Sequence, residues 1–179
     1  MTKAAEVHRI MGRVLGDWFK EHGYRSKRAW GSFWHRPSGE TNILMWVQLD
    51  KYGFDPNLGG KLWLNCCSSL TVSKATQKGE FVPPSTVCSR SQLKEWCAAK
   101  RAVLEKVLRQ PDLGLAGDFF RRSLEWDIKQ PYQQGSVADM PYFDAEDVER
   151  WANLLLEILP AADSEMELRI RNDTKSKEK

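Results

Sequence analysis

The stretch MWVQLDKYGFDPNLGGKLWLN, from Met45 to Asn65, contains two segments of alternating apolar and polar residues around a connection rich in glycine, proline and asparagine. Alternation with a period of two is typical of β-strands that bury one face. Glycine, proline and asparagine are residues that turn a chain. The stretch therefore predicts an antiparallel hairpin, with strands over Thr41–Lys51 and Lys61–Leu70 and a long loop between them.

Side chains alternate across a strand, so the hairpin predicts one apolar face and one mixed face. Aliphatic and thiol side chains share the apolar face: Ile43, Met45, Val47, Leu49, Leu62, Leu64, Cys66 and Leu70. The mixed face carries Trp46 and Trp63, with the amides of Gln48 and Asn65 between them.

The mixed face has two interpretations. As an open platform, its tryptophans and amides would bind a partner protein or stack nucleic-acid bases. As a covered face, it would pack under helices from the second half of the chain, with Trp96 or Trp151 against it. Because amphipathic helices need a surface on which to bury their apolar stripe, the sequence favours the covered face.

Helical patterns flank the hairpin. Apolar residues at helical spacing near the N-terminus are Val7, Ile10, Met11, Val14, Leu15 and Trp18. Gly23 follows as the expected end of this helix. The Ser89–Gln92 segment has the form of a capping box and predicts the start of a helix that ends at Pro111. Asp144 is the expected N-cap of a further helix, which we expect to end at Pro160.

The remaining segments are less regular. An aromatic strand is predicted over Trp30–Arg36, and a further strand is expected at Leu70–Ser73 or Glu80–Val82. A short helix is predicted over Leu115–Arg122 and a loop over Gln130–Phe143. Together the patterns predict an α+β fold, with a small antiparallel sheet of three to five strands packed with three to four amphipathic helices.

The length of 179 residues suits one domain, which we place at residues 1–160. Residues 161–179 are predicted to form a charged C-terminal tail, partly extended or disordered, because Met166, Leu168 and Ile170 alternate with charges and nothing after Asn172 can be buried.

The composition is that of an ordinary globular protein, with 41% hydrophobic and 28% charged residues. No apolar run reaches the length of a membrane span, and the first ten residues lack the apolar core of a secretion signal. We therefore expect a cytoplasmic protein without membrane contact.

The four cysteines, Cys66, Cys67, Cys88 and Cys97, form no C-x-x-C pair. The three histidines are not at zinc-site spacings either, so no metal and no cofactor are predicted. Reduced and partly buried thiols are the expectation.

Charge is distributed unevenly along the chain. Residues 1–40 carry eight Lys and Arg against four Asp and Glu, whereas residues 144–179 carry six against ten. The densest basic run is Arg25, Lys27 and Arg28, which with the strand aromatics provides an alternative hypothesis of nucleic-acid binding. No phosphate loop, dinucleotide fingerprint or hydrolase motif occurs, so no motif points to an enzyme, although catalytic groups can converge from distant positions. An unrecognised hydrolase that uses His35 and a carboxylate stays open as a second alternative.

Short motifs around the hairpin resemble a bacterial family, the domain of unknown function numbered forty-three-oh-four. The matching residues are Gly23, Tyr24, Lys27, Phe33, Gln48, Lys51, Tyr52, Trp63 and Asn65. The resemblance extends from about Glu6 to Pro160 and includes the last helix, PYF…DVERWANLLLEILP. It implies an α+β fold and no established activity. Small bacterial domains of this kind are associated with immunity or phage-defence accessory roles.

These observations predict a non-enzymatic protein-interaction module, with a protein as its expected partner. The predicted binding residues lie on the mixed face, in the hairpin loop and in the basic run: Trp46, Gln48, Lys51, Tyr52, Trp63, Asn65, Arg25, Lys27 and Arg28.

Overall fold

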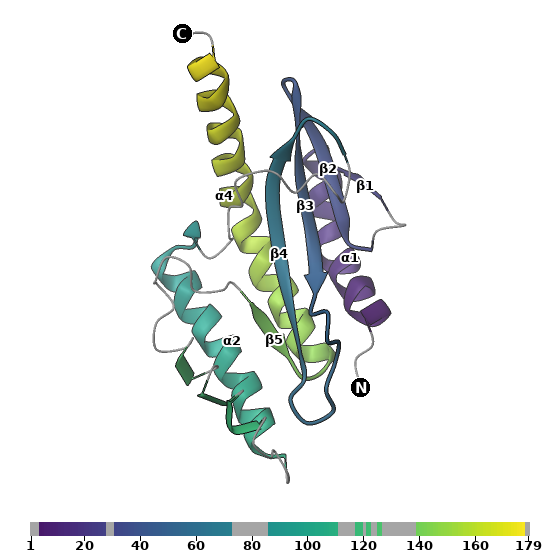
Figure 1. The fold of residues 1–179 in the computed structure, drawn as a ribbon, viewed down its shortest axis with the longest axis vertical. Helices are drawn as coiled ribbons and strands as arrows, with labels where there is room; N and C mark the ends of the chain where they lie inside the picture. The colour runs from purple at the N-terminus through teal and green to yellow at the C-terminus, as the bar shows by residue number, and fades with distance from the viewer. Residues whose placement is uncertain are drawn as a thin grey trace.

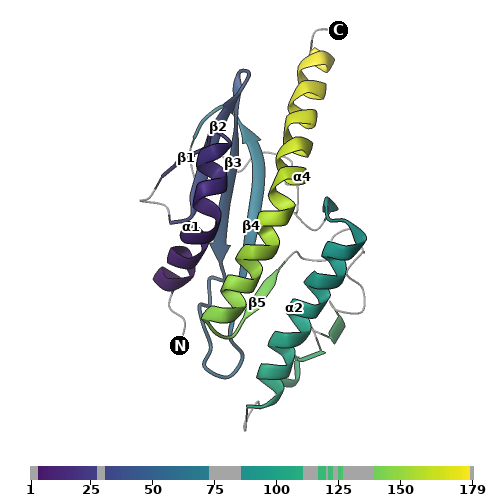
Figure 2. The ribbon, with the colours of Figure 1, turned by 180° about the vertical axis from the view of Figure 1, so that it is seen from behind.

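A computed structural model shows the arrangement of the chain (Figures 1 and 2). It describes residues 4–27, 31–72, 86–110, 117–119, 121–122, 125–126 and 139–177. The strands are β1 (Arg25–Ser26), β2 (Phe33–Ser38), β3 (Thr41–Leu49), β4 (Gly60–Ser69) and β5 (Met140–Tyr142). The long helices are α1 (Ala4–Glu21), α2 (Arg90–Leu108) and α4 (Ala145–Lys177). The strands form one antiparallel sheet in the order β1-β2-β3-β4-β5, which confirms the predicted α+β class.

Local sequence signals set the ends of the helices. After α1, Gly23 has a φ of +79°, and the Tyr24 amide donates to the Phe19 carbonyl at 2.8 Å. Before α2, Ser89 and Gln92 form the predicted capping box. Before α4, Asp144 Oδ1 accepts the amide of Asp147 at 3.1 Å, as an N-cap does.

The predicted hairpin is β3 and β4, in a register that places Trp46 opposite Asn65 and Gln48 opposite Trp63. Residues paired across an antiparallel ladder point to the same face, so all four share one face, as the alternation predicts. We call it the outer face. The opposite face, with Ile43, is the inner face.

Helices α1 and α4 lie side by side on the inner face, and α2 packs beside α4 and β5 (Figures 1 and 2). Buried residues of α1 meet the apolar row of β3 and β4 in one core, which also contains Trp96 and Trp151. The prediction that Trp96 or Trp151 covers the Trp46 and Trp63 face is therefore wrong. The two helices share the inner face because its aliphatic rows, without intervening amides, offer more apolar area.

The last helix is longer than predicted. It runs through Pro160 to Lys177, so the predicted end at Pro160 and the extended or disordered tail over 161–179 are both wrong as far as Lys177. Ala162, Met166 and Ile170 recur every four residues and are buried, at 0, 1 and 8% exposure. Their tertiary contacts offset the backbone hydrogen bond that Pro160 removes.

The strand β5 lies inside the loop predicted over Gln130–Phe143, which is a further correction. A strand of three residues with a central proline is too short to show an alternating pattern in the sequence. It forms because it pairs with Gly60–Leu62. Residues 70–72 are not a strand, and Glu80–Val82 and Trp30 lie outside the described residues. Residues 117–119 and 121–122 are helical, within the short helix predicted over Leu115–Arg122.

Candidate functional site

The outer face has a closed half. Phe33, Leu44, Trp46 and Cys67 form a second buried cluster, against which Val72 packs. The Trp46 side chain belongs to this cluster and only 9% of the residue is exposed. Trp46 is therefore chiefly a packing residue, although the sequence predicted it as part of a binding surface.

The other half of the outer face is open. Gln48 is exposed, and Trp63 and Asn65 are partly exposed. Asn65 Nδ2 donates to Gln48 Oε1 at 3.2 Å, so the two amides hold each other beside the Trp63 ring. Three of the predicted binding residues thus lie together, with donor and acceptor groups left for a partner.

The β3–β4 loop begins at this same end of the sheet and carries Lys51 and Tyr52. Tyr52 is 84% exposed, and Lys51 Nζ lies 4.7 Å from the centre of its ring. Asp50 Oδ1 accepts the Tyr52 amide, and the Gly53 amide donates to the Asp50 carbonyl, both at 3.0 Å. A large aromatic side chain is thereby held in solvent on a hydrogen-bonded turn.

The rest of the loop is also ordered by its own backbone. Asp55 and Gly59 exchange two backbone hydrogen bonds of 2.8 Å, and Asp55 Oδ1 accepts the amides of Asn57 and Leu58. This closed turn fixes the position of the loop tip relative to the strands.

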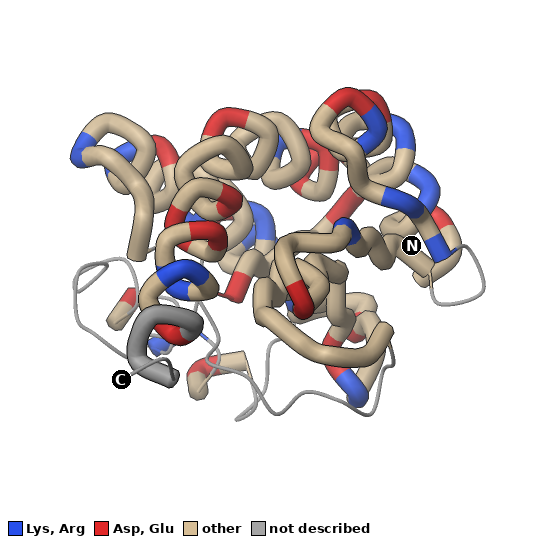
Figure 3. Tube along the Cα trace, turned by 90° about the horizontal axis from the view of Figure 1, so that it is seen from above, with Lys and Arg blue, Asp and Glu red and all other residues tan. Residues whose placement is uncertain are grey.

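The predicted basic run is divided by the structure. Arg25 is exposed opposite His35, whereas Lys27 Nζ donates to the Val72 carbonyl at 3.2 Å. Arg28 lies outside the described residues. Acidic and basic residues are interspersed along the helices, as Figure 3 shows. Among the described residues of the run, Arg25 is therefore the one with an exposed side chain, at the β1 edge of the sheet.

His35 lies on the outer face in the row of Leu44. Within the described residues its Nδ1 atom is buried without a hydrogen-bond partner. Burial and the positive charges of Lys27 and Arg25 lower the pKa of the imidazole. Candidate carboxylates Asp50 and Asp55 accept loop amides instead. This part of the structure does not assemble the acid–base pair that the hydrolase alternative needs.

Buried ion pairs are a feature that sequence reasoning missed. Asp139, 1% exposed, accepts Lys100 Nζ of α2 at 3.0 Å and Lys61 Nζ of β4 at 2.8 Å. Burial opposes the charged form of Asp139, but the two ammonium groups overcome it and lower the pKa of the carboxyl. A signal did exist, since Lys100 lies between Trp96 and Leu104 on the apolar stripe of α2.

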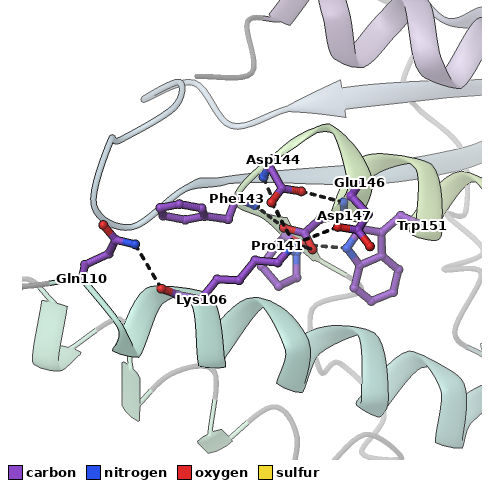
Figure 4. Close-up of polar contacts among 8 residues, drawn as sticks. All are labelled: Lys106, Gln110, Pro141, Phe143, Asp144, Glu146, Asp147 and Trp151. Carbon is purple, nitrogen blue, oxygen red and sulfur yellow. Dashed lines mark hydrogen bonds and ion pairs between the residues drawn. The ribbon is translucent and has the colours of Figure 1, made fainter.

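A second ion cluster joins the end of α2 to the start of α4 (Figure 4). Lys106 Nζ lies 2.8 Å from Asp144 Oδ2 and 2.7 Å from Asp147 Oδ1. The other Asp147 oxygen accepts the amides of Phe143 and Asp144. Nearby, Trp151 Nε1 donates to the Pro141 carbonyl at 2.7 Å. The cluster joins the two helices, and the carboxylate oxygens of Asp144 and Asp147 are all engaged within it.

A third cluster attaches the C-terminal half of α4 to the sheet. Arg36 donates to Asp163 and Glu167 at 2.6 Å each, and its guanidinium lies 5.1 Å from the Tyr24 ring. Tyr24 donates to Asp163 at 2.6 Å, and Ser38 donates to Glu167 at 2.8 Å. We call this group the α4 clasp; its carboxylates are engaged within the protein, whereas the buried Nε of Arg36 has no hydrogen-bond partner among the described residues.

The described residues contain no group of side chains arranged to hold a metal ion. All four cysteines are free, and burial raises the pKa of the thiols of Cys67 and Cys88 to about 11. None of the helices in the described ranges combines the length and apolar character needed to cross a bilayer.

Comparisons with protein-family models, curated proteins and solved structures give no significant match. The resemblance to the family of unknown function stays a prediction.

Proposed function

We propose that this chain is a protein-interaction module that binds its partner through Gln48, Lys51, Tyr52, Trp63 and Asn65, which we call the open patch. The observation that carries the proposal is Tyr52, 84% exposed on a hydrogen-bonded loop next to the open half of the outer face. The exposed Tyr52 ring gains weight because it lies beside the partly exposed Trp63 and a pair of amides, and tyrosine and tryptophan contribute strongly to protein binding.

The residue types of the open patch suit a protein interface. Tyrosine and tryptophan are enriched among the residues that contribute most to binding energy. The paired amides of Gln48 and Asn65 supply hydrogen bonds beside them. Because the loop is already ordered by Asp50 and Asp55, binding would cost less conformational entropy than ordering a free loop.

Nucleic-acid binding is the weaker candidate. Stacking needs accessible rings, and two aromatic residues of the adjoining outer face, Phe33 and Trp46, are buried in its cluster. If nucleic acid is nevertheless the ligand, its affinity should fall steeply with salt concentration, since phosphate contacts release counterions.

The partner class follows only from the resemblance, which implies an immunity or phage-defence accessory role. The test therefore begins with the proteins encoded beside this one, each purified and titrated against the chain. We expect one of them to bind, and Tyr52→Ala and Trp63→Ala to weaken that binding by about tenfold or more.

Leu70→Ala is the matched control, because Leu70 is 74% exposed and lies outside the open patch. It should leave the affinity unchanged. A partner that binds all three variants as tightly as the wild type would show that the open patch is not the interface.

A further inference from the structure

A groove of about 740 Å³ runs along one side of α1, next to the β1–β2 segment. Helix residues from Ala5 to Lys20 line one wall, and Ser26 and Gly31 lie on the other. Fifteen residues of α-helix correspond to about 22 Å, so the groove is long enough for several turns of a second helix. It lies on the α1 side of the sheet and shares no lining residue with the open patch.

Gly12 and Gly16 line the groove in the middle of α1. A Cβ atom added at Gly12 or at Gly16 would meet nothing within 4 Å. Glycine within a helix costs about 1 kcal/mol relative to alanine, and no contact within the described protein requires either one. Their spacing of four residues places both on the same side of the helix, where they let another backbone approach closely.

The charge of the groove is positive. Arg9 and Lys20 lie near its two ends, and no carboxylate is among its described lining residues. Arg9 Nη2 is 3.9 Å from Glu6 Oε1, but that pair is exposed and therefore weak. Lys20 makes no ion pair within the described residues. An occupant with negative charge at both ends would complement the groove.

The shape of the groove distinguishes between anionic occupants. Tyr24 and Trp34 lie at its base with only 6 and 4% of their surfaces exposed, so they offer no ring face on which bases could stack. Arg9 and Lys20 are eleven residues apart, which is about three helical turns or 16 Å. Two acidic residues eleven positions apart on an occupying helix would lie on one face and be separated by the same distance.

We propose that this groove docks an acidic α-helix of a partner protein. Its backbone passes close to Gly12 and Gly16, and two of its carboxylates, about three turns apart, pair with Arg9 and Lys20. This second interaction surface does not depend on the open patch, and either can fail without the other.

The test uses the full chain and a synthetic alanine-based helical peptide of about 18 residues, with glutamates on one face about three turns apart. Two further probes are the same peptide with lysine in place of glutamate, and a thymidine oligonucleotide of about twelve nucleotides. Backbone amide spectra report the site, and fluorescence anisotropy of the labelled probes reports affinity. We expect the glutamate peptide alone to bind and to shift the amides of Gly12 and Gly16.

Two sets of variants assign the binding to the groove. Gly12→Leu with Gly16→Leu fills it, and Arg9→Glu with Lys20→Glu reverses its charge. Each pair should weaken binding of the glutamate peptide by about tenfold or more, and the charge-reversed chain should gain affinity for the lysine peptide. Asp17→Leu is the matched control, because Asp17 is an exposed α1 residue outside the groove lining.

Filling the groove should not unfold the protein, since the added side chains start in open space. Melting temperatures of the leucine variants check this. Four results would overturn the proposal: equal binding of both peptides, no effect of the leucine pair, oligonucleotide binding at the Gly12 and Gly16 amides, or no shift of those amides with any probe.

Discussion

Asp139 is a charged residue of the described chain that is only 1% exposed. Its carboxylate is almost completely buried between Lys100 and Lys61. We predict that Asp139→Asn lowers the free energy of unfolding by about 3–5 kcal/mol, because the buried ammonium of Lys100 then faces a neutral amide. Urea unfolding measures the loss.

Lys61→Met and the pair Asp139→Asn with Lys100→Met are the controls. Lys61 is less buried than Lys100, so its loss should cost less. Removing both buried charges together should recover most of the stability, since the ammonium that remains, that of Lys61, is partly exposed to solvent. A loss below about 1 kcal/mol for Asp139→Asn alone would mean that water reaches this site.

Trp63 and Trp46 are neighbours on the outer face with different exposure. We predict that Trp63→Ala costs about 1–2 kcal/mol of stability, because the ring is only partly buried, whereas Trp46→Ala costs about 3–5. The urea unfolding midpoints of the two variants can be compared directly, since both residues lie in the same hairpin. Equal losses would show that Trp63 is also a core residue.

At the scale of elements, α4 depends on different contacts before and after Pro160. The first half packs in the core, whereas the second half adds the polar contacts of the α4 clasp to the buried side chains of Met166 and Ile170. We predict that Arg36→Met raises amide hydrogen exchange in residues 163–170 by about tenfold or more and leaves residues 148–158 unchanged.

Ser38→Ala is the milder control, because it removes only the 2.8 Å hydrogen bond to Glu167. If exchange rises equally along the whole of α4 in the Arg36 variant, the helix opens as one unit and the clasp has no local role.

Helix α1 carries two glycines that its own packing does not need. We predict that Gly12→Ala and Gly16→Ala each stabilise the protein by about 0.5–1 kcal/mol, through lower entropy of the unfolded chain and better helix propensity. Thermal unfolding measures the gain.

Gly59→Ala is the opposite case and serves as the control. Gly59 has a φ of +77°, and an added Cβ would collide with the Tyr142 carbonyl. That substitution should destabilise the protein. A loss of stability at Gly12 or Gly16 would point to an internal contact at the groove wall.

For the whole molecule, ion pairs and hydrogen bonds of three carboxylates make stability depend on pH. Burial opposes ionisation of Asp139, Asp144 and Glu167, but their lysine, arginine and hydrogen-bonding partners lower the pKa of each carboxyl below its ordinary value of 3.8, 3.8 and 4.5. Groups with a lowered folded pKa stabilise the protein above the unfolded value and lose that effect as the pH falls.

We therefore predict a first loss of stability as the pH falls through about 6.5, because the unfolded His35 takes up a proton that the folded imidazole resists, and a further decline below about pH 4.5 as these carboxylates are protonated. Asp139→Asn should show a shallower decline, because one of the three groups is gone. An identical slope in that variant would assign the acid sensitivity to other carboxylates.

Local patterns were enough to predict the hairpin of β3 and β4, the α1 stripe, the caps at Gly23, Ser89 and Asp144, and the α+β class. These features depend on backbone propensity and on side-chain periodicity within about ten residues. The placement of Gln48, Trp63 and Asn65 on one face also follows from alternation alone. These features can be predicted from the sequence because they depend on residues that are close together along the chain.

Tertiary contacts determined the rest. The strand β5 exists because Gly60–Leu62 pairs with it, and α4 continues past Pro160 because Arg36 and the core retain its second half. The division of the outer face into a closed and an open half, and the burial of Lys100 against Asp139, depend on residues dozens of positions apart. Energies of that kind arise only when the chain has packed, because burial and charge pairing are properties of the assembled surface and not of the local sequence.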